Sequence, residues 1–270
     1  MIKISIIIPN YNGAKYLSDC LKHLKVAINN CPNSKFEIIL VDNGSKDNSI
    51  QLFNHLTTQL NNHSSIQLPT NTGFATAVNR GIKVAKYEYI CLLNNDVNLD
   101  KNWFKLIIKN IKNNPKTSCF CGTVLNYDGT QIESQGISFD WSGKCLQNQN
   151  HPPGLVWGAS GAVVIYQKNI IKYLGLFDEK YFAYIEDVDL AFRLQKKGYQ
   201  TLLVPAVIAY HLGGGTSNRM GNFRAKQIFK NWFYFIFKNY SKKEILINLP
   251  KITIERLRNL SYLIKSTINK

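Results

Sequence analysis

Long hydrophobic runs are missing from this 270-residue sequence, whose longest wholly apolar stretch is Trp232 to Phe237. A membrane-spanning helix needs about 18 apolar residues, so we expect no transmembrane segment. The stretch from Met1 to Ile8 carries only Lys3 as a charged side chain and has no small-residue cleavage site. It therefore predicts a first strand and no signal peptide.

Cysteine pairs with metal-site spacing are also missing. The six cysteines never form a C-x-x-C pattern, and several lie in apolar segments. This usage is typical of buried thiols in a reducing cytosol and disfavours a disulfide framework or a zinc site. The sequence therefore predicts a cytoplasmic protein.

Acidic residues are few, 17 against 33 lysines and arginines, which gives a net charge of +16. The excess is concentrated in 219–270, where twelve basic and two acidic residues alternate with aromatic ones. A helix packed on the rest of the protein with solvated lysines explains this pattern, and so does an interfacial helix on an anionic membrane. Nucleic acid ranks lowest as a partner, because no RNA- or DNA-binding signature accompanies the charge.

The apolar pattern of the first half predicts an α/β fold. Strands are expected at four apolar runs: 4–9, 36–41, 66–68 and 89–93. Helical spacing lies between them, with Ser45 and Asp100 at the expected starts of the second and fourth helices. This alternation indicates an open, mostly parallel sheet with helices on both faces. Later elements are expected as helices at 168–173, at 187–197 and from 226 onward, and as strands at 201–204 and 207–210.

Polar clusters follow three of the expected strands, and α/β sheets bind ligands at the carboxyl ends of their strands. Asp42 can accept a ring N–H from a uracil or thymine base beside the flat face of Tyr11, or it is a turn former. The oxygens of Asn94-Asn95-Asp96 suit Mg²⁺ or Mn²⁺, although such residues also favour turns. No G-x-G-x-x-G pattern is present, which argues against a dinucleotide-binding oxidoreductase.

Further candidates come from later segments. His211 ends an apolar strand and can complete a metal's ligand set, or it is structural. The following Gly213-Gly214-Gly215 can let backbone approach a diphosphate, or it forms a loop. Gly73 precedes a helix that contains Asn79, and the backbone N–H groups there can face an anionic leaving group. A glycine-containing loop before an ordinary helix start would give the same pattern.

Three acids, Glu186, Asp187 and Asp189, stand at an expected helix start directly after an aromatic run. Each alone is typical of a cap or an ion-pair partner. Neighbouring aromatic side chains can raise the pKa of a carboxyl group toward the value that a general base needs. The segment is therefore a candidate site for removing a proton from a hydroxyl.

The order of these motifs resembles family 2 glycosyltransferases of the GT-A fold, in their rhamnosyltransferase-like branch. The stretches that carry the resemblance are Ser5 to Gly13, Val41 to Ser45, Asn71 to Phe74 with Asn79 and Gly81, Leu92 to Val97, Trp157 to Gly161, Phe177-Asp178, Phe182 to Leu190, and His211 to Ser217. The resemblance implies a catalytic domain over 1–218, with a nucleotide-binding half at about 1–100 and an acceptor half at about 115–218. The remaining 219–270 is expected to form basic aromatic helices.

The resemblance also implies an activity, the inverting transfer of a sugar from a nucleoside-diphosphate donor, dTDP-rhamnose first and UDP-hexoses second. The acceptor would be a glycan or lipid-linked glycan at the inner face of the membrane, in surface polysaccharide synthesis. Asp187 matches the family's catalytic base, with Glu186 and Asp189 as alternative candidates for that role. Asp96 matches the metal-binding motif, of which only this last carboxylate is present, and His211 matches a second metal ligand in some members.

Donor and acceptor residues follow from the same resemblance. The expected donor-binding residues are Pro9, Tyr11, Asp42, Gly73, Asn79, Asn94 and Asn95. The expected acceptor-binding residues are Trp157, Gly158, Ser160 and Asp189. Two rivals remain. A nucleotidylyltransferase would normally carry a basic loop after the first strand, and 9–13 has no Lys or Arg. A non-catalytic carbohydrate- or membrane-binding module would not depend on Asp187.

Overall fold

The computed structural model of the protein describes residues 1–58, 62–212 and 222–268. Its centre is a mixed sheet in which β1 (Lys3–Asn10), β2 (Lys35–Asp42), β3 (His63–Gln67) and β4 (Tyr89–Leu93) run parallel. β11 (Val163–Gln167) pairs antiparallel with β4 and with β6 (Cys119–Asn126), and β12 (Thr201–His211) runs parallel to β6. The strand order is β10-β12-β6-β11-β4-β1-β2-β3. The prediction of an α/β fold with a mostly parallel sheet is confirmed.

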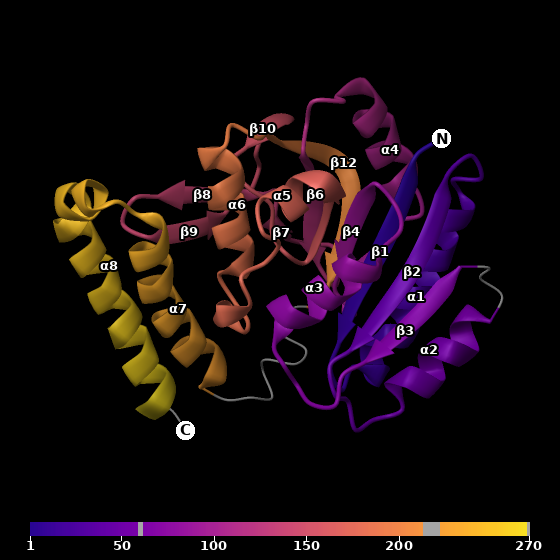
Figure 1. Ribbon diagram of the computed structural model, residues 1–270, viewed down its shortest axis with the longest axis horizontal. Helices are drawn as coiled ribbons and strands as arrows, with labels where there is room; N and C mark the ends of the chain where they lie inside the picture. Colours follow the sequence, from indigo (N-terminus) through magenta and orange to yellow (C-terminus); the bar gives the residue numbers. More distant parts are fainter. Residues whose placement is uncertain (59–61, 213–221, 269–270) are drawn as a thin grey trace.

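The remaining elements are three short strands of the same sheet (β5, β7 and β10), a separate β8–β9 hairpin, and the helices (Figure 1). Their bounds are α1 (Ala14–Asn29), α2 (Ser49–Thr57), α3 (Phe74–Val84), β5 (Val97–Leu99), α4 (Trp103–Asn113), β7 (Ile132–Ser134), β8 (Ile137–Asp140), β9 (Lys144–Gln147), β10 (Gly154–Val156), α5 (Lys168–Tyr173), a 3₁₀ turn (Glu179–Tyr181), α6 (Glu186–Lys196), α7 (Phe223–Asn239) and α8 (Lys242–Ile268).

Helices cover both faces of the sheet because successive strand residues point to opposite sides. Ile4, Ile6 and Ile8 of β1 pack with α1, α2 and α4 in one apolar cluster. Ile7 packs with α3, α5 and α6 in a second cluster on the other face. A third cluster joins α6 to α7 and to the β8–β9 hairpin (Figure 1).

Several expected boundaries are corrected. α2 begins at Ser49 and not at Ser45, because the backbone N–H of Ser45 donates to Asp42 Oδ2 and holds that segment as a loop. The two expected strands near 201–210 form one strand, β12, whose pairing with β6 is irregular between Leu203 and Ile208. The helix expected from Asp187 begins one residue earlier, at Glu186.

The structure also bears on the predictions made from the cysteines and from the lack of long apolar runs. All six cysteines are free, and all except Cys145 are buried, as expected for structural thiols. In the described part of the chain, no helix combines the length and the hydropathy that crossing a bilayer would require.

Candidate active site

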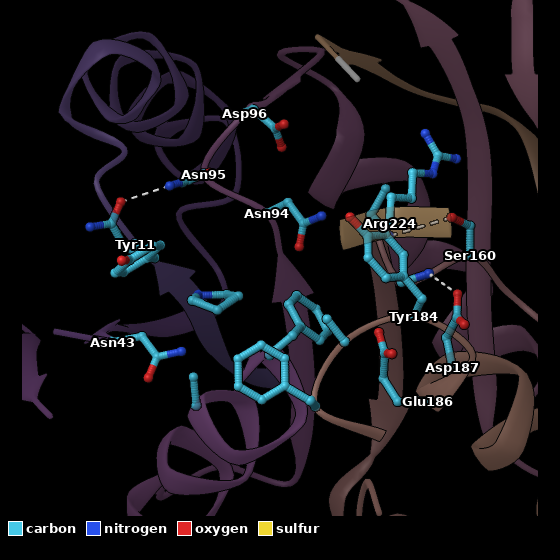
Figure 2. Close-up of a pocket in the computed structure, with 18 of the residues that line it drawn as sticks. Tyr11, Asn43, Asn94, Asn95, Asp96, Ser160, Tyr184, Glu186, Asp187 and Arg224 are labelled. Carbon is cyan, nitrogen blue, oxygen red and sulfur yellow. Dashed lines mark hydrogen bonds between the residues drawn. The ribbon is translucent and has the colours of Figure 1, made fainter. Parts of the chain in front are cut away.

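A cleft of about 460 Å³ opens where the carboxyl ends of β1, β2 and β4 meet the start of α6. Tyr11 and Asn43 lie on one side of it, Glu186 and Asp187 on the other, and Asn94 lies between them (Figure 2). The expected site residues that line the cleft are Pro9, Tyr11, Asn94, Asn95, Asp96, Ser160, Glu186, Asp187 and His211. The expected residues outside the lining are Asp42, Gly73, Asn79, Trp157, Gly158 and Asp189.

Asn10 joins the three strand ends that form one wall of the cleft. Its Nδ2 donates to Asp42 Oδ1 at 3.0 Å, and its Oδ1 accepts from Asn95 Nδ2 at 2.7 Å. Asp42 also accepts from the backbone of Ser45 and is 4% exposed. A Cβ on Gly13 would lie 2.0 Å from Asn95 Nδ2, so a larger residue there would displace this wall.

Asn43, which the sequence analysis did not single out, lines the cleft in place of Asp42. Its Nδ2 donates to the Gly73 carbonyl at 3.1 Å, and its Oδ1 accepts from the backbone N–H of Thr72 at 2.9 Å. Asn79 lies deeper and bonds in both directions with the backbone of Phe177. Gly73 and Asn79 therefore connect α3 to neighbouring loops, and neither of the two residues lines the cleft.

His211 lines the cleft and lies between two carboxylates. Its Nε2 is 3.4 Å from Asp96 Oδ1, and its Nδ1 is 2.9 Å from Glu133 Oε2. Burial opposes protonation of the imidazole, but the hydrogen bonds and charges of Asp96 and Glu133 outweigh it and raise the pKa of His211 to about 9. Glu133 on β7 was not anticipated from the sequence.

A divalent cation fits this donor set. Within the described ranges, no group of three or more His, Cys, Asp or Glu side chains forms a complete metal centre. Asp96 Oδ1 and His211 Nε2 nevertheless lie 3.4 Å apart, so a cation that displaces the imidazole proton could contact both, and Asn94 Oδ1 of the same cleft is buried without a hydrogen-bond partner. Mg²⁺ and Mn²⁺ often take one or two protein carboxylates and complete their shell with water and substrate phosphates. Glu133 on the other imidazole nitrogen is the kind of partner that orients a metal-binding histidine.

Glu186, which is buried, and Asp187, which is half-buried, lie together on the opposite wall (Figure 2). Asp187 accepts from the backbone N–H of Gly161 at 3.0 Å and from that of Val188 at 2.8 Å. Burial raises the pKa of Asp187, and these N–H groups oppose the rise. Burial, followed by the charge of Asp187, raises the pKa of Glu186 to about 8, and Glu186 Oε2 has no hydrogen-bond partner. At neutral pH the arrangement favours an ionised Asp187 beside a protonated Glu186.

The backbone that presents this pair is strained. Phe182 has φ 61° and ψ −65°, and the N–H of Ala183 donates to the Tyr181 carbonyl at 2.7 Å, which makes a γ-turn of the rare positive-φ type. Tyr184 and Ile185 follow with φ of 68° and 72°. Each such residue costs about 1–3 kcal/mol unless its surroundings impose the conformation.

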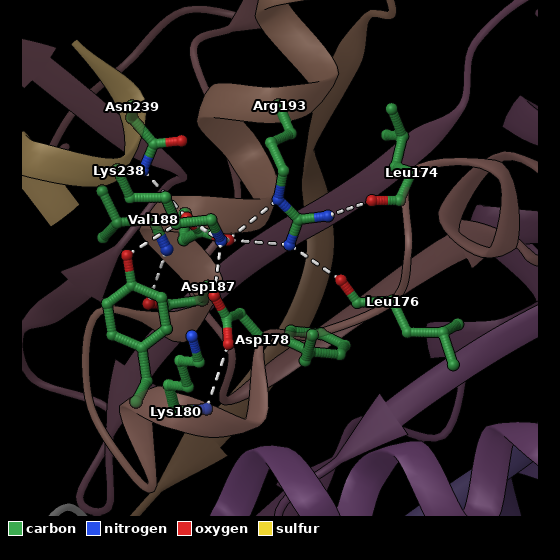
Figure 3. Close-up of polar contacts among 12 residues, drawn as sticks. Leu174, Leu176, Asp178, Lys180, Asp187, Val188, Arg193, Lys238 and Asn239 are labelled. Carbon is green, nitrogen blue, oxygen red and sulfur yellow. Dashed lines mark hydrogen bonds and ion pairs between the residues drawn. The ribbon is translucent and has the colours of Figure 1, made fainter. Parts of the chain in front are cut away.

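Asp189 faces away from the cleft and belongs to a buried ion-pair network. It is 0% exposed and contacts Arg193 of the same helix and Lys238 of α7. Arg193 in turn donates to the carbonyls of Leu174 and Leu176 (Figure 3). These contacts leave Asp189 no exposed oxygen for an acceptor, in contrast to the role expected from the sequence.

Trp157 and Gly158 are likewise part of the scaffold in this structure. The Trp157 ring stacks on Phe139 with the ring centroids 4.6 Å apart, and its carbonyl accepts from Gln195. Gly158 exchanges backbone hydrogen bonds with Ile137. Of the expected acceptor residues, Ser160 alone lines the cleft.

Arg224 and Tyr184 are two further lining residues that the sequence analysis missed (Figure 2). The Arg224 guanidinium lies 5.9 Å from the centroid of the Tyr184 ring. Among the described residues, the ion pairs found include none with Arg224. The expected glycine loop at 213–215 lies outside the described residues.

The family model of Glycosyl transferase family 2 matches residues 5–175. This chain belongs to that family. The family 2 chain is also 26% identical over 211 residues to poly-beta-1,6-N-acetyl-D-glucosamine synthase of Staphylococcus aureus, covering 77% of this chain and 50% of that protein. It is 35% identical over 126 residues to glycosyltransferase GlyG of Streptococcus pneumoniae, covering 46% of this chain and 40% of that protein. The chain therefore spans half the length or less of these relatives.

Solved structures show the same fold at low sequence identity. Residues 1–349 of TarS from S. aureus superpose with a TM-score of 0.63 at 18% identity, covering 98% of this chain and 81% of that one. The mannosyltransferase PcManGT of Pyrobaculum calidifontis, solved with GDP-Man and Mn²⁺, gives a TM-score of 0.66 at 14% identity, covering 97% and 73%. The family 2 chain therefore has the GT-A architecture expected from its motifs.

Proposed function

We propose that this protein is an inverting glycosyltransferase that moves a sugar from a nucleoside-diphosphate sugar to a hydroxyl group of a glycan or lipid-linked glycan. The observation that carries the proposal is the carboxyl pair Glu186–Asp187, which faces the strand ends at Asn94 and Asp96 across one cleft. Family membership supports the reaction class.

Asp187 is the general base in this proposal. Its carboxylate takes the proton from the acceptor hydroxyl, the oxygen forms a bond to C1 of the sugar, and the bond from C1 to the diphosphate oxygen breaks on the opposite face. The nucleoside diphosphate leaves with the bonding electrons, so one displacement inverts the configuration at C1. A positioned general base typically contributes about 10²–10⁴-fold to the rate.

The neighbouring groups have supporting roles. Glu186, protonated at neutral pH by its raised pKa, donates a hydrogen bond from the cleft wall to a bound sugar. Arg224 offers a cation to the leaving diphosphate. Asp96 and His211 would hold a Mg²⁺ or Mn²⁺ ion, which when bound neutralises charge on that diphosphate.

The donor remains to be identified by experiment. The sequence motifs favour dTDP-rhamnose, followed by UDP-hexoses. Structural neighbours have been solved with UDP, UDP-GlcNAc and GDP-Man, so these nucleotides belong in the same panel. Tyr11 on the donor side of the cleft supplies an aromatic face for a nucleobase, and Asn43, whose amide bonds to residues 71–73, fixes the loop beside it.

The test is a panel of single nucleotide sugars with Mn²⁺, first by thermal shift and then by release of nucleoside diphosphate. A ligand that binds the folded state raises the melting temperature, and the true donor should also be slowly hydrolysed. Pyrophosphate released from a nucleoside triphosphate and a sugar phosphate would indicate a nucleotidylyltransferase instead. Binding without any release would indicate a carbohydrate-binding module.

We also propose that the protein works at the surface of an anionic membrane, through α8. An apolar row is 38–72% exposed at helical spacing on this helix: Leu246, Leu249, Leu257, Leu260 and Ile264. Exposed lysines flank the row, and 219–270 carries a net charge of +10. Because like charges repel, this charge favours an anionic lipid surface over a second copy of the chain as the partner that covers the row. α8 lies at the outer edge of the molecule beside α7 (Figure 1).

Sedimentation with lipid vesicles tests this location. The wild-type protein should bind phosphatidylglycerol vesicles and leave phosphatidylcholine vesicles unbound. Leu257→Glu should weaken the binding at least severalfold, whereas Tyr173→Glu, which changes a similarly exposed residue on α5, should not. Equal binding of both variants, or a dimer through α8 in light scattering, would overturn the proposal.

A further inference from the structure

The strained turn before the proposed catalytic pair is held from outside its own segment. Its carbonyl groups at Tyr181, Ala183 and Tyr184 converge on a single atom, Asn231 Nδ2, at distances of 2.9, 2.8 and 2.7 Å. Asn231 belongs to α7 and is 1% exposed. An amide nitrogen carries two donor hydrogens, so at least one of them is shared between two of the three carbonyl oxygens, and the amide oxygen could not replace it because it only accepts.

The α7 side chains that make polar contacts with the segment before α6 lie on one helix face. Asn231, Tyr234 and Lys238 follow one another at steps of three and four residues, which places them in a row. Tyr234 OH donates to Asp178 at 2.8 Å, and Lys238 Nζ lies 2.7 Å from the same carboxylate. This row therefore contacts the segment that leads into α6 at Asp178 and again at 181–184.

The far end of the segment is fixed by the same helix. Lys238 Nζ also lies 2.8 Å from Asp189, and Asn239 Nδ2 donates to Asp189 at 2.9 Å. At the near end, the Phe223 ring of α7 contacts the Phe182 ring with the centroids 5.8 Å apart. Of these α7 side chains, Asn231 is the one that bonds to the backbone of the turn at 182–185, which also accepts the N–H of Ala75 of α3 at the Phe182 carbonyl at 3.3 Å.

We propose that Asn231 is a positioning residue for the transfer reaction, because it holds the turn at 182–185 in the conformation that directs Glu186 and Asp187 into the cleft. The inference rests on the proposed function, which gives this pair its catalytic role. It assigns a part in catalysis to α7, which lies beyond the segment matched by the family model. Displacing a reacting group by about 1 Å can cost about 10²-fold in rate.

Two variants of the full-length protein test the inference. Asn231→Ala removes the donor, and Asn231→Asp keeps the shape but turns an oxygen toward the three carbonyls. Asn239→Ala is the matched control, since Asn239 is a buried α7 residue that donates to Asp189 and not to the turn. The measurements are amide hydrogen exchange over 182–188, binding of UDP with Mn²⁺ by calorimetry, and kcat with the donor from the panel.

Asn231→Ala should speed exchange over 182–188 at least tenfold and lower kcat by about 10²-fold, with UDP affinity within twofold of wild type. Asn231→Asp should lower kcat further than Asn231→Ala does. Asn239→Ala should keep wild-type exchange in the turn and a kcat within twofold of wild type. Unchanged exchange in Asn231→Ala, or equal losses of kcat in Asn231→Ala and Asn239→Ala, would overturn the inference. A loosened turn in a protein whose wild type releases no nucleoside diphosphate from any donor would instead refute the proposed function.

Discussion

Replacing Glu186 with glutamine should change the alkaline side of the pH–rate profile and leave the acid side in place. Burial, followed by the charge of Asp187, raises the pKa of Glu186 to about 8, so the side chain is protonated and can donate a hydrogen bond at neutral pH. Glutamine has a similar shape and donates through its amide at every pH. The acid limb belongs to Asp187, which the substitution retains.

The size of the effect follows from the fraction of Glu186 that is protonated. With a pKa of about 8, that fraction falls about tenfold between pH 7 and pH 9. Wild-type kcat/KM should therefore lose about tenfold more over this interval than kcat/KM of Glu186→Gln, measured as initial release of nucleoside diphosphate. His211, whose pKa is raised to about 9, is present in both proteins and cancels in the ratio.

The pH dependence of folding stability should also reflect the raised pKa of Glu186. A carboxyl whose pKa is raised by folding stabilises the protein below its unfolded value, near 4.5, and loses this contribution as the pH rises toward 8. The melting temperature of wild type should thus fall more between pH 5 and pH 8 than that of Glu186→Gln. Identical alkaline limbs in the two proteins would refute the assigned protonation, and an inactive Glu186→Gln would make Glu186 the base.

Three other predictions concern separate parts of the structure. Lys238→Met removes an ion-pair partner of the buried Asp189 and should lower the free energy of unfolding by about 3 kcal/mol in urea titrations. Lys230→Met, on the exposed face of α7, should change it little. Equal stabilities of the two variants would contradict the ion-pair network around Asp189. Arg224→Ala should raise the donor KM about tenfold or more by removing a charge-assisted hydrogen bond, and an unchanged KM would remove Arg224 from the diphosphate site. Asp96→Ala should abolish the Mn²⁺-dependent part of donor binding in calorimetry, so wild-type metal dependence in this variant would place the cation elsewhere.

The sequence predicted those parts of the fold that local patterns determine. Apolar runs with helical stretches between them are enough to identify a parallel sheet, and the polar residues after its strands identify the ligand-binding edge. Asn10 and Asn43 lie next to predicted residues, yet their role in joining strand ends depends on which side chains meet across the sheet. That pairing has no signal in the local sequence.

The motif around α6 shows the same limit more sharply. Asp187 and Asp189 are two positions apart at the start of one helix, which separates them by about 200° around its axis. Asp187 therefore faces the cleft and Asp189 faces α7, although the sequence gives both the same appearance.

The C-terminal aromatic segment was open to two interpretations, and α7 follows the first of them. Trp232 and Phe235 are buried against α6 and the β8–β9 hairpin, while Phe237 stays 72% exposed. The contact of Asn231 with the turn at 182–185 could not be predicted, because it needs the position of α7 relative to a segment about 50 residues away. Glu133 beside His211 escaped prediction for the same reason.

The most direct measurement of the central claim compares Asp187→Asn with wild type in two assays on the same samples. Calorimetry with the identified donor and Mn²⁺ should give dissociation constants within twofold of each other, because the strand-end wall of the cleft is unchanged. Acceptor-dependent release of nucleoside diphosphate should fall by about 10²–10⁴-fold in the variant. Turnover at the wild-type rate by Asp187→Asn would show that the carboxylate at this position does not take the acceptor's proton.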